Sequence, residues 1–87
     1  MSKVTIFYLP TCPHCKKAFE LIKEIQEENP ELAAVEMELI NEREEEELAN
    51  SFDYYYVPCC YVDGVKLMEG VPDKEALLQV FKTAAGV

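Results

Sequence analysis

The sequence predicts a single α/β domain over residues 1–87, with a four-stranded mixed sheet flanked by helices. Three observations lead to this fold class: a strand-helix-strand pattern from Lys3 to Leu39, a hairpin signal at Asp63-Gly64, and an amphipathic stretch after Asp73. Hydrophobic residues make up 49% of the 87 residues, which is enough for one modest core. A chain of this length has no room for a second domain.

The first strand and the first helix are separated by a change of pattern at Pro10. Lys3–Leu9 is β-branched and aromatic, which indicates a buried strand that Pro10 ends. From Pro13 onward, apolar residues recur at helical spacing, while lysines and glutamates occupy the other face. Pro13 suits the first turn of this helix, and Asn29-Pro30 ends it. The residues expected on its buried face are Cys15, Ala18, Phe19, Ile22 and Ile25.

A second strand and a short helix are expected next. Apolar residues alternate with Glu36 and Glu38 in the period-two pattern of a strand with one covered face. This strand should lie parallel to the first, through a right-handed crossover. Asn41 with Glu44 three residues later resembles a capping arrangement, so a short helix should follow and run to about Phe52. The residues expected on the covered face of the strand are Val35, Met37 and Leu39.

The remainder of the chain predicts two antiparallel strands and a helix. Cys59–Val62 and Val65–Met68 flank Asp63-Gly64, a strong signal for a tight β-hairpin. Asp73 is placed to cap a final helix. The apolar stripe of that helix, assigned to the core, is formed by Leu77, Val80, Phe81 and Ala84. The predicted order of elements is therefore βαβ-α-ββα.

The charge balance excludes two classes of function. The 8 basic and 17 acidic residues give a net charge of -9, which repels phosphate backbones and anionic membrane surfaces. We therefore expect no nucleic-acid partner and no membrane association. The apolar stretch Val4–Leu9 is too short for a signal peptide, and no run approaches the length of a membrane span. We expect a cytoplasmic protein that acts as a monomer.

The motif Cys12-Pro13-His14-Cys15 lies where the first strand meets the first helix, and this position predicts redox chemistry. The thiolate is the form that attacks disulfides, so such a site must lower the pKa of one cysteine while keeping its sulfur exposed. Cys12 precedes the helix, where free N–H groups and the helix dipole stabilise an anion. Cys15 lies one turn further in. Cys12 is therefore predicted to be the nucleophile and Cys15 the resolving thiol.

His14, between the two cysteines, is predicted to stabilise the Cys12 thiolate further when its imidazole is protonated or donates a hydrogen bond. While the thiol pKa stays below the ambient pH, each unit by which it falls stabilises the reduced form by about 1.4 kcal/mol, or roughly 30 mV for a two-electron couple. We therefore expect a more oxidising site than one with a small neutral dipeptide. The alternative is that His14 is an exposed spacer with little effect.

Metal binding is the alternative use of these cysteines. Cys-x-x-Cys is also half of many zinc sites, and Cys12 and Cys15 could hold a metal or an iron-sulfur cluster together with a thiol of glutathione or of a partner chain. The position between a strand and a helix favours catalysis. We therefore predict no metal and no resident cofactor.

Val57-Pro58 immediately precedes the third strand and is the second signature of the site. A trans proline there would be an ordinary strand-entry residue. A cis bond would instead turn the Val57 backbone toward the active-site cysteines, leaving its N–H and C=O free to pair with the extended backbone of a substrate.

Cys59 and Cys60 follow this proline directly, and because strand side chains alternate, only one of them can face the active-site side. Free cysteine is a common small core residue, so we expect burial without a redox function. The alternative is a third reactive thiol, which exchanges with the Cys12–Cys15 disulfide or completes a metal or iron-sulfur site in a dimer.

Three motifs together resemble the glutaredoxins of the thioredoxin-fold superfamily: Cys12-Pro13-His14-Cys15-Lys16-Lys17-Ala18, Tyr56-Val57-Pro58, and Val62-Asp63-Gly64. The resemblance covers nearly the whole chain and implies a thioredoxin fold of the glutaredoxin-like form. Thioredoxins proper usually carry an extra N-terminal strand and helix and a Trp before the first cysteine. The resemblance favours the cis form of the Val57-Pro58 bond. It implies an enzyme that reduces or exchanges protein or small-molecule disulfides, with Val57 and Pro58 contacting the substrate backbone.

The resemblance also implies glutathione as a reducing co-substrate, bound through a loop that contains Gly70. The sequence departs from the family there, because Glu69-Gly70 replaces the usual Gly-Gly and Val71-Pro72-Asp73 replaces the usual acidic residues. Asp73 is then expected to meet the amino group of glutathione, whereas Glu69 adds negative charge beside an anionic tripeptide. A reductase of the thioredoxin-reductase kind is the alternative electron donor.

Overall fold

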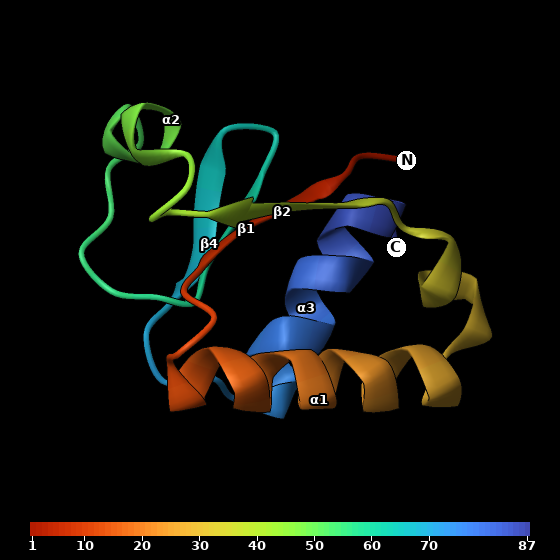
Figure 1. Cartoon of the computed structure of the whole chain (residues 1–87). Helices are drawn as coiled ribbons and strands as arrows, with labels where there is room; N and C mark the ends of the chain where they lie inside the picture. The colour runs from red at the N-terminus through yellow and green to blue at the C-terminus, as the bar shows by residue number, and fades with distance from the viewer.

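The computed structural model describes residues 1–87 and has the α/β fold expected from the sequence. A strand-helix-strand unit is followed by a short helix, a hairpin and a final helix (Figure 1). The elements in order are β1 (Val4–Tyr8), α1 (Pro13–Glu28), the 3-10 helix η1 (Pro30–Ala34), β2 (Met37–Asn41), α2 (Glu46–Asn50), β3 (Cys59–Val62), β4 (Val65–Glu69) and α3 (Lys74–Ala85). None of these helices is long and apolar enough to cross a membrane.

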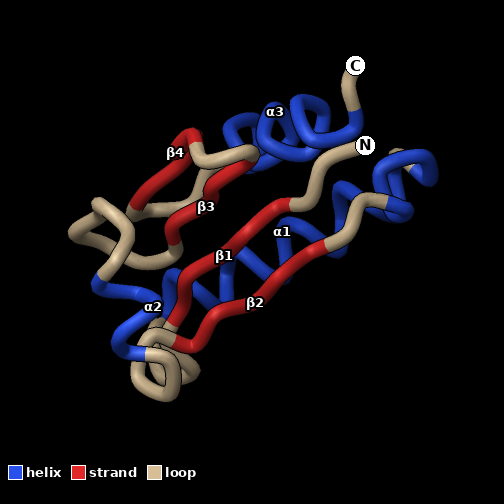
Figure 2. The backbone as a smooth tube through the Cα atoms, turned by 90° about the horizontal axis from the view of Figure 1, so that it is seen from above, coloured by secondary structure: helices blue, strands red, loops and turns tan.

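The strands form one mixed sheet in the order β2-β1-β3-β4 (Figure 2). β1 pairs in parallel with β2 and antiparallel with β3, and β3 pairs antiparallel with β4. At the hairpin, Asp63 and Gly64 have φ values of 51° and 80°, as a two-residue turn of this kind requires. The predicted mixed sheet and hairpin are both confirmed. Since β1 is an inner strand of the sheet, the chain that follows Tyr8 leaves the sheet between its two neighbouring strands and not at an outer edge.

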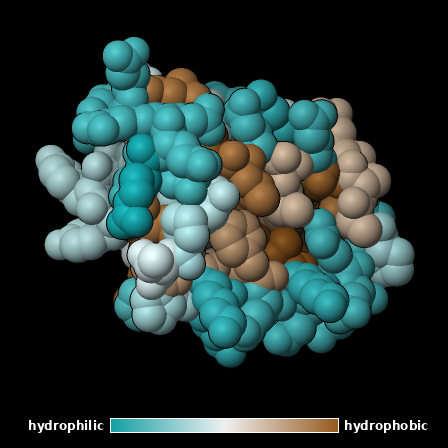
Figure 3. Space-filling view, viewed as in Figure 1, coloured by the Kyte–Doolittle hydropathy of each residue, from teal (hydrophilic) through white to brown (hydrophobic).

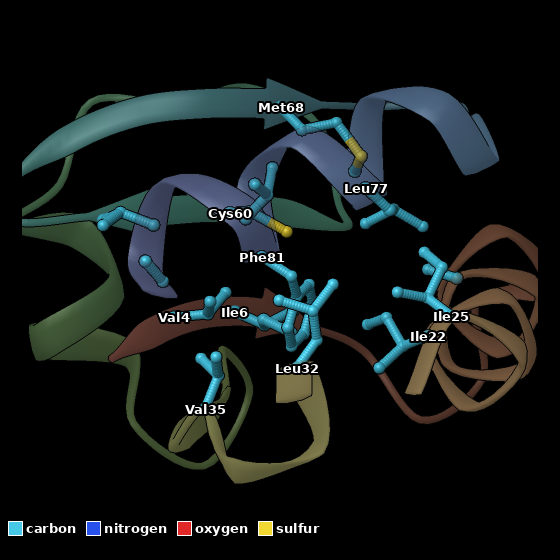
Figure 4. Close-up of a cluster of buried hydrophobic side chains, with 14 of the residues drawn as sticks. Val4, Ile6, Ile22, Ile25, Leu32, Val35, Cys60, Met68, Leu77 and Phe81 are labelled. Carbon is cyan, nitrogen blue, oxygen red and sulfur yellow. The ribbon is translucent and has the colours of Figure 1, made fainter. Parts of the chain in front are cut away.

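The larger hydrophobic core lies between the sheet and the layer formed by α1 and α3 (Figures 1 and 4). Ile6 and Cys60 contribute from the sheet, Ile22 and Ile25 from α1, and Phe81 from α3. The predicted apolar stripe of α3 is buried as expected. In α1 four of the five expected residues are buried, while Phe19 is only partly covered; the fifth buried residue, missed from the sequence, is Leu21.

A smaller core lies on the opposite face of the sheet, under α2. Phe7 and Cys59 point to this face and pack with Ala49 of α2. The Phe7 ring lies 4.7 Å from the Phe52 ring and 4.8 Å from the Tyr54 ring, measured between centroids. These aromatic contacts hold the long connection between α2 and β3 against the sheet, and this connection carries the residues that face the cysteines.

The prediction for the covered face of the second strand is wrong at Leu39. Val35 is buried but precedes β2, and Leu39 is 46% exposed, whereas Ile40 on the opposite face is buried. The alternation itself holds, because Ile6 and Leu39 are register partners of parallel strands and share a face. Since β2 is an edge strand, the helix layer that covers Ile6 leaves Leu39 open to solvent.

The second helix is shorter than predicted. The Asn41 side chain does accept hydrogen bonds from the backbone N–H groups of Arg43 and Glu44, at 3.0 and 3.4 Å. These bonds close one isolated turn directly after β2, and the regular helix α2 begins only at Glu46. Asn41 is thus a turn-forming residue and not the cap of α2. The glutamate-rich segment is exposed, as a solvated helix start should be.

Candidate active site

Cys12 and Cys15 lie at the start of α1, where the loop that leaves β1 turns into the helix. Cys12 occupies the N-cap position, with φ −85° and ψ 119°, and Pro13 is the first helical residue. Cys12 is partly exposed, whereas Cys15 is buried at 1% exposure. Both thiols are free in this structure. The predicted asymmetry in accessibility is therefore present: one sulfur reaches solvent and the other faces the interior.

The pKa of the Cys12 thiol lies below its ordinary value of 9.0. Burial raises this pKa, but the backbone N–H and the thiol of Cys15 and the backbone N–H of His14 lower it by more. The negative charge of Glu42 opposes them. Cys12 is thus stabilised as an anion chiefly by the free N–H groups of the first helical turn, as the sequence predicts.

The pKa of Cys15 shifts in the opposite direction. Burial raises this pKa most, and the Leu9 backbone lowers it in part. The hydrogen bond with Cys12 and the charges of Cys12 and Glu42 add to the rise, and the net value is about 11. Cys15 therefore stays protonated when Cys12 ionises, and its S–H supports the Cys12 thiolate. This order of ionisation is the one that assigns attack to Cys12 and resolution to Cys15.

The Val57-Pro58 peptide bond is cis, which confirms the conformation favoured from the sequence. The Cys12 Sγ–H donates a weak hydrogen bond to the Val57 carbonyl oxygen at 4.0 Å. The carbonyl of Pro58 in turn accepts a hydrogen bond from the Gly70 backbone N–H at 2.9 Å. Segments from three parts of the chain thus meet at the nucleophile: the start of α1, the residues before β3 and the residues after β4.

An open groove of about 450 Å³ lies beside Cys12 where these segments meet, and we call it the cis-proline groove. It is lined by His14, Tyr56, Val57, Glu69, Gly70 and Val71. Its surroundings are unusually apolar for a surface, since Tyr55, Tyr56 and Val71 are 84%, 70% and 73% exposed. Exposed apolar side chains gathered around a reactive group are typical of a binding site.

Glu69, at the end of β4, holds the loop that forms one wall of this groove. Its carboxylate accepts hydrogen bonds from the backbone N–H groups of Tyr55 and Tyr56 and pairs with Lys66 at 2.9 Å. Lys66 first, and then the two N–H groups, lower the pKa of Glu69 to about 2. From the sequence alone, Glu69 is expected only to add a repulsive charge. No local signal links Glu69 to Tyr55, because only the folded sheet brings them together.

Of the three other predicted site residues, two line the cis-proline groove and one does not. Gly70 has a φ of +87° and lines the cis-proline groove beside Val57. His14 is exposed and lines the same groove. Asp73 does not line it; its carboxylate accepts a hydrogen bond from the Ala76 N–H at 3.2 Å and caps α3, as the sequence also predicts.

Cys59 and Cys60 are both buried at 0% exposure, on opposite faces of the sheet. Burial raises the pKa of each thiol to about 12. Their burial and their opposite orientation are both as expected from the sequence. No group of three or more His, Cys, Asp or Glu side chains in the chain is arranged to hold a metal ion.

The fold and the paired cysteines together define a class of protein. A thioredoxin fold that presents a partly exposed cysteine of lowered pKa at a helix N-terminus, with a buried cysteine one turn later, is a thiol-disulfide oxidoreductase of the Cys-x-x-Cys kind.

The chain belongs to the thioredoxin family, since residues 2–82 match the family model described as thioredoxin domain. It is 36% identical over 80 residues to a thioredoxin of Methanocaldococcus jannaschii, covering 92% of both chains. It is 30% identical over 77 residues to a probable thioredoxin of Methanothermobacter marburgensis, covering 88% of both.

Two solved structures share the fold at low sequence identity. A mutant thioredoxin from Halobacterium salinarum aligns with a TM-score of 0.71 and 20% identity, over 99% of this chain and 76% of that one. A malarial protein aligns with a TM-score of 0.72 and 15% identity, over 97% of both chains. The predicted thioredoxin fold is therefore confirmed.

The names and lengths of the relatives can be compared with the glutaredoxin-like branch that the sequence favours. They are named thioredoxin, and the one from Methanocaldococcus jannaschii is matched over 92% of its own length. A protein named thioredoxin thus has about the length of this chain, so an extra N-terminal strand and helix is not a feature that separates thioredoxins from glutaredoxins here. The superfamily is confirmed, and the glutaredoxin-like branch stays a prediction.

Proposed function

We propose that this chain reduces or exchanges disulfide bonds of polypeptide substrates, with Cys12 as nucleophile and Cys15 as resolving thiol. The observation that carries the proposal is the opposite shift of the two thiol pKa values at one helix N-terminus, lowered at Cys12 and raised to about 11 at Cys15. The exposed thiol is the one that ionises, so a substrate disulfide can reach it.

The cycle has two exchange steps. The Cys12 thiolate attacks one sulfur of the substrate disulfide, forming a Cys12–substrate bond and expelling the other sulfur as a thiolate, which takes up a proton. Cys15 then loses its proton to solvent or to the expelled thiolate and attacks the Cys12 sulfur, which releases the second substrate thiol. The products are a substrate dithiol and a Cys12–Cys15 disulfide, so two electrons have passed to the substrate.

The cis-proline groove supplies the contact for the substrate backbone. In the resting enzyme the Val57 carbonyl accepts the Cys12 S–H. Once Cys12 is a thiolate or part of a mixed disulfide, that S–H is gone and the carbonyl is free to accept an N–H from an extended substrate chain. The exposed rings of Tyr55 and Tyr56 offer apolar contact to the side chains of such a segment.

For the electron donor we propose a protein dithiol, of the thioredoxin-reductase kind, in preference to glutathione. Asp73, which the glutaredoxin resemblance assigns to glutathione, is occupied in capping α3. Glu69 places a carboxylate of lowered pKa in the groove wall, where glutathione would bring its own negative charges. Gly70 keeps a position suited to a ligand, so slow reduction by glutathione is compatible with the structure.

The test is capture of the mixed disulfide. Cys15→Ser should accumulate a covalent complex with a disulfide-containing polypeptide such as insulin, and Cys12→Ser should form none. Mass spectrometry of the complex should place the bond on Cys12. Equal trapping by both variants, or a bond on Cys59 or Cys60, would contradict the assignment of Cys12 as the nucleophile.

A further inference from the structure

A second groove of about 430 Å³ lies on another flank of the α1 N-terminus, and we call it the lateral groove. It shares no residue with the cis-proline groove. Its lining is Tyr8, Leu9, Pro10, Cys15, Lys16, Phe19, Glu20 and Lys23. Cys15 is buried in its wall, so an occupant would touch the edge of the active site without reaching the resolving thiol.

The floor of the lateral groove is apolar. The Phe19 ring packs edge-on against Tyr8 at 5.4 Å between centroids, and it is only partly covered by the core. Leu39 lies outside this lining, but it is 46% exposed and on the same face of the sheet as Tyr8, because β1 and β2 are paired in register. Figure 3 shows hydrophobic side chains gathered between α1 and β2 on this face, with hydrophilic side chains on both sides. An apolar surface that the chain does not cover itself is typical of a contact with a partner.

The rim of the lateral groove is basic, in a chain of net charge -9. Lys16, Lys17 and Lys23 are exposed on α1, and none of them forms an ion pair. By contrast, Lys3, Lys66 and Lys74 all pair with glutamates. The lysines at the rim are therefore free to meet a ligand's charge. Glu20 is the single acidic residue in the lining, so the lateral groove favours an anionic occupant.

We propose that the lateral groove docks an acidic polypeptide segment with an aromatic or aliphatic side chain, carried by the protein dithiol that restores reduced Cys12 and Cys15. The apolar side chain would lie on Phe19 and Leu39, and its acidic neighbours would face Lys16 and Lys23. This inference rests on the proposed function for the partner's role. In that exchange the partner's two thiols become a disulfide while the Cys12–Cys15 disulfide becomes two thiols, so electrons and protons balance.

Docking here would leave the cis-proline groove open. A partner held beside Cys15 would lie within about one helical turn of Cys12, while the exposed tyrosines stay available to a polypeptide substrate. The two grooves would thus distinguish partners by charge: the lateral groove selects an acidic donor, and the cis-proline groove contributes no free lysine to its lining.

The test uses a synthetic probe, the peptide acetyl-Glu-Asp-Phe-Leu-Asp-Glu-amide, titrated into the oxidised full-length chain and followed by backbone amide NMR shifts. Shifts should centre on Phe19, Lys23 and Leu39. Lys16→Glu and Lys23→Glu should each weaken binding about fivefold, as expected when an attractive charge becomes a repulsive one. Lys82→Glu, a charge-matched change of an unpaired lysine on α3, should weaken it less than about twofold through net charge alone.

Several outcomes would overturn the proposal: shifts centred on Tyr56 and Val71, no saturable shifts, equal binding of a peptide with lysines in place of the acids, or an equal loss in Lys82→Glu. Since the probe has no disulfide, a failure here is separate from a failure of the trapping experiment on Cys15→Ser. Trapping by the Lys23→Glu form of that variant should be unchanged.

Discussion

The carboxylate of Glu69 accepts a hydrogen bond from the backbone N–H of Tyr56 at 2.9 Å, across thirteen residues of chain. It thereby ties the end of β4 to the loop that delivers Val57 to Cys12. Lys66, three residues earlier on β4, forms an ion pair with the same carboxylate at 2.9 Å. Two exposed tyrosines and the backbone proposed to bind substrate are thus held in part by one acidic side chain.

Replacing Glu69 by Ala should raise the KM for a polypeptide disulfide by about fivefold and leave kcat nearly unchanged, because binding is loosened while the thiols keep their environment. Glu69→Gln keeps an acceptor for the N–H groups, so its KM should stay close to that of the wild type. The alkylation rate of Cys12 is the control, and it should not move in either variant. A loss confined to kcat would show that Glu69 acts on the thiols and not on the loop.

The buried thiol of Cys60 should make the reduced protein less stable in alkali. Its pKa is raised from 9.0 to about 12, so it adds no pH dependence below pH 9.0, and stability is lost as the pH rises from there toward 12. For one such thiol the slope is at most about 1.4 kcal/mol per pH unit. Urea unfolding of the wild type and of Cys60→Ala, below and above pH 9.0, should therefore show the smaller alkaline loss in the variant. An equal loss of unfolding free energy in the two proteins would contradict the raised pKa of Cys60.

His14→Ala separates the imidazole from the backbone N–H, which alanine retains. We expect the Cys12 pKa to rise by up to about one unit and the dithiol potential to fall by up to roughly 30 mV, since a less stable thiolate makes the reduced form less favoured. Ultraviolet thiolate absorbance against pH measures the first, and equilibration with a glutathione buffer the second. Thr11→Ala is the control at a neighbouring exposed position. Unchanged values would leave the backbone N–H groups and the Cys15 thiol as the causes and His14 as a spacer.

Asp73→Ala should lower the free energy of unfolding by about 1 kcal/mol through loss of the α3 cap, and Asp73→Asn should lose much less because asparagine also caps helices. Neither variant should change the rate at which glutathione reduces the Cys12–Cys15 disulfide, because Asp73 lies outside the cis-proline groove. If Asp73→Asn slowed that reduction while keeping its stability, Asp73 would be a glutathione contact after all.

Features with a local cause could be predicted from the sequence. Asp63-Gly64 adopts the two positive φ values that its turn needs, and the position of Cys12 before Pro13 places it at the N-terminus of α1. The cis conformation of Val57-Pro58 has no such local signal; the glutaredoxin resemblance favours it, and it is present.

Features that depend on tertiary neighbours could not be predicted. The period-two pattern assigns Leu39 to the correct face, but only the strand order shows that this edge position is left uncovered. Glu69 looks like a charge in a ligand loop until the sheet brings it to the N–H groups of Tyr55 and Tyr56. Asn41 forms a capped turn that the following residues do not continue as a helix.

The central claim is that Cys12 alone is the activated thiol, and the pH dependence of its alkylation tests this most directly. With reduced protein and limiting iodoacetamide, peptide mass mapping should find the label on Cys12, at a rate that rises with pH to a plateau with a midpoint below 9.0. Cys15 should react only at higher pH, toward its own value of about 11. A Cys12 midpoint at or above 9.0, or faster labelling of Cys15, would contradict the account.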